Sequence, residues 1–64
     1  MTAVETFWAL PQEYHLMVHR EAGGPIQAAI ITPNWSTGRA GFFGSGPTQE
    51  AACAEALEKL EKAK

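Results

Sequence analysis

The uneven placement of charge and glycine most constrains the fold of this chain. Between Ala22 and Gln49 the only charged residue is Arg39, and this span contains all six glycines and three of the four prolines. Glycine and proline interrupt helices, so the span predicts short strands joined by turns. The charges gather instead in residues 50–64, which is typical of a helix with one solvated face.

The chain has 64 residues, and we expect one small domain over residues 1–64. The net charge of −2 argues against a strongly basic nucleic-acid-coating protein, and the single cysteine, Cys53, excludes an internal disulfide. No apolar run approaches the roughly 20 residues that cross a bilayer, and no signal-peptide pattern is present. We therefore expect a cytoplasmic protein without a membrane partner.

The first segment, Thr2 to Leu10, is predicted to be a short helix. Thr2 and Glu5 have the spacing of a capping box, and Pro11 disfavours helical backbone at Leu10. Val4, Phe7 and Trp8 then share one apolar stripe. A strand is the alternative, because Val4, Thr6 and Trp8 also alternate with other residues.

Three strands are expected to follow, at Glu13 to Glu21, Ile26 to Thr32 and about Gly38 to Gly44. In the first, Tyr14, Leu16 and Val18 point one way, while His15, Met17 and His19 point the other. The turn before the second strand contains Gly23, Gly24 and Pro25. Gly41 weakens the third strand, and Gly44 and Gly46 are expected to turn the chain into the last helix.

The final helix is predicted from Thr48, its N-cap, to about Ala63. Its inner stripe consists of Ala52, Cys53, Ala56, Leu57 and Leu60. The predicted fold class is α+β with the order α-β-β-β-α. It consists of a three-stranded antiparallel sheet, a long C-terminal helix on one face and a short N-terminal helix.

This order resembles the double-stranded RNA-binding domain. The matching pieces are a turn at Gly24-Pro25, Gly44-Ser45-Gly46 after the third strand, the cap Thr48, and Ala52 with Ala56–Leu60 in the last helix. The resemblance implies the fold. The lysine-rich helix start with which that family contacts RNA corresponds here to Gln49 and Glu50, so the phosphate-binding charge is missing.

The chain is also similar to HicB-type antitoxins, which occupy a toxin surface. The shared pattern is Gly-x-Thr-x-Glu at the start of a helix that follows an antiparallel sheet, matched by Gly46-Pro47-Thr48-Gln49-Glu50. The DNA-binding tail that such antitoxins often carry has no counterpart here. The resemblance implies a protein partner.

The candidates for catalysis and metal binding are weak. His15 and His19 share a face of their strand, but four residues separate them by roughly 13 Å, which is too far for both to bind one ion. Cys53 lies on the inner stripe, where a cysteine is usually a small buried hydrophobe. We therefore expect no enzyme activity, no cofactor and no metal.

The aromatic residues near the third strand are stronger candidates. Phe42 and Phe43 point to opposite faces of a regular strand, and one helix-covered face takes only one of them. The other either joins a core under the first helix, through Phe7 and Trp8, or belongs to a contact surface.

The sequence therefore predicts a non-enzymatic protein-binding module, an antitoxin-like or phage-type inhibitor of a larger bacterial or viral protein. Its expected binding residues are Trp35, Arg39, Phe43, Met17 and His19. Self-association as a homodimer is an alternative. Nucleic-acid binding is the disfavoured alternative, through Gln27, Arg39, Gln49, Lys59 and Lys62.

Overall fold

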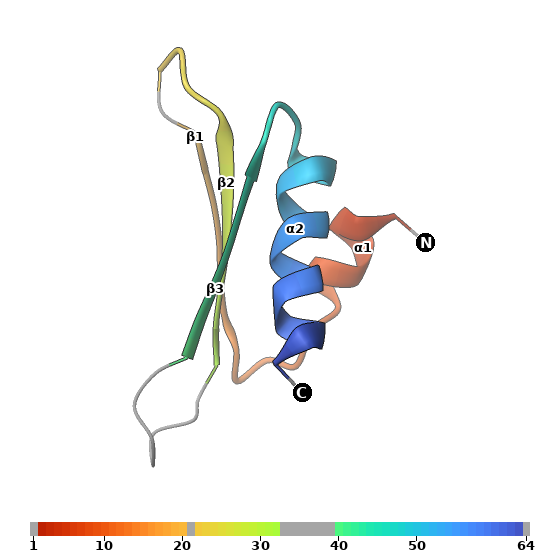
Figure 1. Ribbon diagram of the computed structural model, residues 1–64. Coiled ribbons are helices and arrows are strands. Elements are labelled where there is room, and N and C mark those ends of the chain that lie inside the picture. The colour runs from red at the N-terminus through yellow and green to blue at the C-terminus, as the bar shows by residue number, and fades with distance from the viewer. Residues whose placement is uncertain (1, 21, 33–39, 64) are drawn as a thin grey trace.

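The computed structural model describes residues 2–20, 22–32 and 40–63 and confirms the α+β order. The elements are α1 (Ala3–Trp8), β1 (His15–Arg20), β2 (Ile26–Thr32), β3 (Ala40–Gly46) and α2 (Gln49–Lys62). The three strands form an antiparallel sheet in the order β1-β2-β3. Figure 1 shows both helices on the same side of this sheet.

The N-terminal segment is a helix rather than a strand, because a capping box holds its first turn. The Thr2 hydroxyl accepts a hydrogen bond from the Glu5 N–H at 3.1 Å, and the Glu5 carboxylate accepts one from the Thr2 N–H at 2.9 Å. These bonds satisfy donors that the first turn leaves without helical partners. The helix ends at Trp8, before Pro11.

Strand β3 ends at Gly46, two residues beyond the predicted end at Gly44, so Gly46 belongs to the strand and not to the turn. A methyl group built on Gly44 would lie 2.5 Å from the backbone nitrogen of Ala56, and one on Gly46 would lie 2.7 Å from Cβ of Ala51. Both glycines thus let β3 lie directly against α2. The expected strand start at residues 38–39 lies outside the described residues.

The core lies between the sheet and the two helices. Thr48 caps α2 as predicted, by accepting a hydrogen bond from the Ala51 N–H at 3.1 Å. The inner stripe of α2 is buried apart from Leu57, which is half-buried. The buried hydrophobic side chains of the core are Phe7, Ala28, Ile30, Ala52, Cys53, Ala56 and Leu60.

Helix α1 packs beside α2 on this covered side. The Glu50 carboxylate accepts hydrogen bonds from the N–H groups of Ala3 at 2.7 Å and Val4 at 3.2 Å, which joins the two helix starts. Phe7 is fully buried in the core, and the exposed Trp8 packs edge-on against it. The first helix therefore leaves the second face of the sheet uncovered.

Among the described residues, no helix is long and apolar enough to span a membrane.

Candidate functional site

The side of the sheet that faces away from the helices carries an exposed apolar patch, which we call the open face. Strand alternation places Leu16, Val18 and Phe42 against the core and turns their neighbours outward. Met17 is 59% exposed and Phe43 is 57% exposed. The apolar residues of the open face are Met17, Ala29, Ile31 and Phe43.

The register of the strands aligns three of these side chains, Met17, Ala29 and Phe43, in one row across the sheet. Met17 lies opposite Ala29, and Ala29 lies opposite Phe43. The Phe43 ring occupies the space that a side chain at Gly41 would fill, since a methyl group there would lie 3.0 Å from the ring. The patch therefore crosses all three strands.

A hollow of about 460 Å³ runs over this row and past the edge of β3 to α2. Its floor is apolar, and its polar lining residues are His19, Gln27, Ser45, Glu55 and Lys59. An apolar centre with polar surroundings is the usual composition of a protein–protein contact surface.

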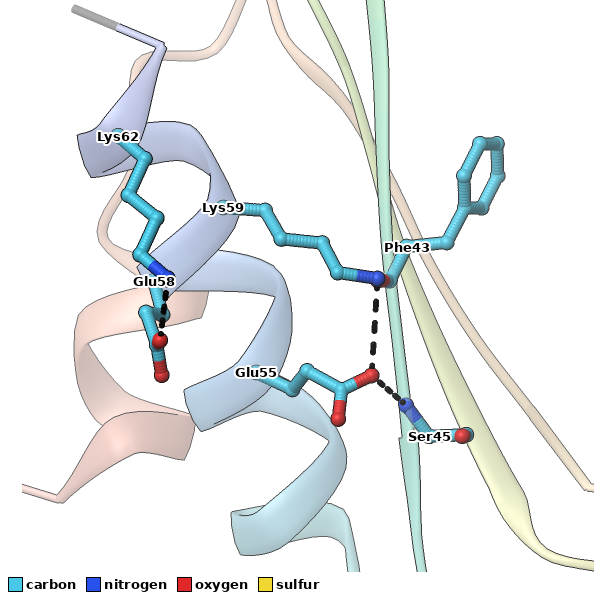
Figure 2. A network of polar contacts seen from close by, with 6 residues as sticks. All are labelled: Phe43, Ser45, Glu55, Glu58, Lys59 and Lys62. Carbon is cyan, nitrogen blue, oxygen red and sulfur yellow. Dashed lines mark hydrogen bonds and ion pairs between the residues drawn. The ribbon is translucent and has the colours of Figure 1, made fainter.

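Two side chains of α2 cover the outer edge of β3 (Figure 2). Lys59 Nζ donates a hydrogen bond to the Phe43 carbonyl oxygen at 2.6 Å, and the Ser45 N–H donates one to Glu55 Oε1 at 3.2 Å. Lys59 and Glu55 also form an ion pair at 3.7 Å. These contacts satisfy backbone groups that an edge strand otherwise leaves open, and they fix the strand that carries Phe43.

The structure brings together three of the five expected protein-binding residues. Met17, His19 and Phe43 line the same hollow. Trp35 and Arg39 lie outside the described residues, so their roles stay predictions. Glu55 and Ser45 were missed, because the spacing of Glu55 and Lys59 indicates only a solvated ion pair and does not show that both reach β3.

The structure does not bring the described residues of the nucleic-acid alternative together on one surface. Gln27 and Lys59 line the hollow, while Gln49 is an exposed residue at the start of α2. Lys59 pairs with Glu55, and Lys62 pairs with Glu58 at 3.0 Å. Each of these lysines thus has a carboxylate neighbour that reduces its attraction for phosphate.

The remaining reactive side chains in residues 2–20, 22–32 and 40–63 do not gather into a chemical site. Burial raises the pKa of the Cys53 thiol, and the negative charge of Glu50 raises it further, so the nucleophilic thiolate is disfavoured. His15 and His19 are exposed on β1 and are separated along the strand. In the described part of the chain, no three His, Cys, Asp or Glu side chains form a group that could hold a metal ion.

Comparison with protein-family models, curated proteins and solved structures gives no significant match.

Proposed function

We propose that the chain is a non-enzymatic protein-binding module that acts by occupying the surface of a larger protein. The activity would be that of an antitoxin or a small phage-type inhibitor. The observation that carries the proposal is the open face, where Met17 and Phe43 are both more than half exposed on a sheet whose other face is buried. Large exposed apolar side chains grouped on one rigid surface favour a docking role.

The composition of the face favours a protein partner over nucleic acid. Aromatic and Met side chains are enriched where proteins meet, whereas phosphate binding depends on lysine and arginine. The open face has an apolar row at its centre, and its lining residue Lys59 is already paired with Glu55. A partner with a complementary apolar ridge would bury this row and leave the polar surroundings in water.

The expected binding energy of the row is concentrated in Phe43 and Met17. Truncation of a central anchor to alanine typically costs about 2 kcal/mol or more in binding, which weakens an affinity about 30-fold. Both side chains are exposed in the free chain. Their substitution should therefore change binding far more than folding.

The test is affinity capture of the partner from a cell extract with the full chain, quantified by mass spectrometry. We expect Phe43→Ala and Met17→Ala to lose the partner that the unaltered chain captures. Trp8→Ala is the matched control, because Trp8 is 53% exposed but lies on α1, on the opposite side of the molecule. Equal capture by all four chains, with circular dichroism unchanged, would show that the open face is not the binding surface.

A gel-shift titration with double-stranded RNA at two salt concentrations tests the alternative function. Phosphate-dominated binding weakens steeply as salt rises, while apolar protein contact changes little. Retardation of the RNA that falls with salt and persists in Phe43→Ala would replace the protein-binding proposal with RNA binding.

A further inference from the structure

The two edges of the sheet differ in how their backbone groups are satisfied. At the β3 edge, Phe43 and Ser45 direct backbone groups away from β2, and side chains of α2 bind them. The alternation of an antiparallel ladder then fixes which residues of β1 direct their backbone N–H and C=O groups away from β2, at the other edge of the sheet. Given the pairs Ala28↔Gly44 and Met17↔Ala29, those residues on β1 include Leu16 and Val18.

The outward backbone groups of Leu16 and Val18 have no hydrogen-bond partner among the described residues. Their side chains, which lie at the margin of the core, are only half-buried. An exposed edge strand of this kind is a template for pairing with another strand. Within the described ranges, the outward backbone groups of Leu16 and Val18 on β1 are thus unpaired and their side chains are only half-buried, whereas α2 covers the β3 edge.

We propose that β1 pairs antiparallel with β1 of a second copy of this chain, which joins the two sheets into one of six strands. A continuous sheet requires a two-fold axis perpendicular to it, so residues directly opposite one another must share a face. The axis then passes between the two β1 strands, at the level of a residue that lies opposite its own copy, and the two central choices for that residue are Met17 and Val18.

An axis at Met17 gives the better-matched pairs. It places Leu16 opposite Val18 of the second copy, so that two half-buried apolar side chains meet on the core side. An axis at Val18 would instead place Leu16 opposite Arg20 of the second copy, an apolar residue against a cation. The register with Met17 at the axis is therefore the one we propose.

The same register joins the two open faces. The Met17 side chains of the two copies meet at the axis, and each is flanked by His15 of one copy opposite His19 of the other. The dimer would present one apolar surface with a Phe43 on either side. Met17 belongs both to the open face and to the pairing edge, whereas Phe43 lies on β3, away from that edge. Phe43→Ala therefore tests the proposed function without touching the pairing strand.

Cysteine cross-linking of the full chain tests both the pairing and its register. At the proposed axis the two residues at position 17 form a pair without mutual hydrogen bonds, with Cα atoms about 4.5 Å apart, which is within reach of a disulfide. Two residues at position 19 would be displaced by four residues, roughly 13 Å along the strand. Met17→Cys should therefore form a covalent dimer under mild oxidation, while the matched control His19→Cys should form no disulfide between chains.

The native Cys53 remains in both variants because it is buried, and the unaltered chain serves as its control. Equal cross-linking of Met17→Cys and His19→Cys, or none in Met17→Cys, overturns the proposed register.

Sedimentation equilibrium of the unaltered chain tests association itself. We expect twice the 6.9 kDa chain mass at high concentration. A dimer with an association free energy of about 4 kcal/mol is substantially populated at a chain concentration of about 1 mM. A measured mass that stays equal to that of one chain up to this concentration overturns the dimer.

Discussion

Replacement of Gly44 by alanine is the sharpest test of how the helix lies on the sheet. Gly44 is a buried residue of β3 that faces α2, and its backbone has no positive φ angle, so an alanine would not strain the strand. The added methyl group would lie 2.5 Å from the Ala56 nitrogen and would also overlap the Ala52 carbonyl oxygen. Both obstacles are helix backbone, which moves only if α2 separates from β3.

The size of the effect follows from this geometry. Overpacking of a well-packed core costs typically 1–3 kcal/mol, and we expect about 3 kcal/mol because no flexible side chain can make room. A domain of this length has a free energy of unfolding of about 3–10 kcal/mol. Gly44→Ala should therefore remove a third or more of the stability.

Urea unfolding followed by circular dichroism measures this loss. With a slope of about 1 kcal/mol per molar urea, the midpoint should fall by about 3 M, or the variant should be unfolded without urea. Gly41→Ala is the matched control, since its methyl group would meet only side chains, the Phe43 ring at 3.0 Å and Ile31 at 3.3 Å. We expect a change of less than about 1 kcal/mol for Gly41→Ala. A Gly44→Ala midpoint close to that of the unaltered chain would refute the close packing of β3 on α2.

Two further predictions concern the helices. Glu50→Ala removes the acceptor for two N–H groups at the start of α1 and should cost about 1–2 kcal/mol in urea unfolding, as the loss of a helix cap does; an unchanged midpoint would contradict this role. The raised pKa and burial of Cys53 predict that a thiol reagent at neutral pH labels the folded chain slowly, and that labelling accelerates through the urea transition. Rapid labelling of Cys53 while circular dichroism stays native would contradict the burial.

Local patterns in the sequence were sufficient to predict the elements and their faces. The spacing of Thr2 and Glu5 predicted the first helix, and strand alternation predicted that Phe42 and Phe43 lie on opposite faces of the sheet, as the half-buried Phe42 and the exposed Phe43 do. Both patterns depend only on neighbours along the chain, where helix and strand periods are fixed by backbone geometry.

These local patterns do not predict contacts between elements that are distant along the chain. Gly44 and Gly46 predicted a turn because glycine is a common turn residue, whereas the structure uses them for close packing of strand on helix. The sequence did not predict which side of the sheet α1 covers. That placement depends on the Glu50 carboxylate, 46 residues away from the Val4 N–H that it binds.

Both helices cover one face of the sheet, and we propose that the open face docks on a partner. Hydroxyl-radical footprinting of the full chain, free and in complex with the captured partner, measures this most directly. We expect Met17 and Phe43 to be labelled in the free chain and protected in the complex, while Trp8 stays labelled in both. Protection of Trp8 with continued labelling of Met17 and Phe43 would place the contact on the helices and contradict the claim.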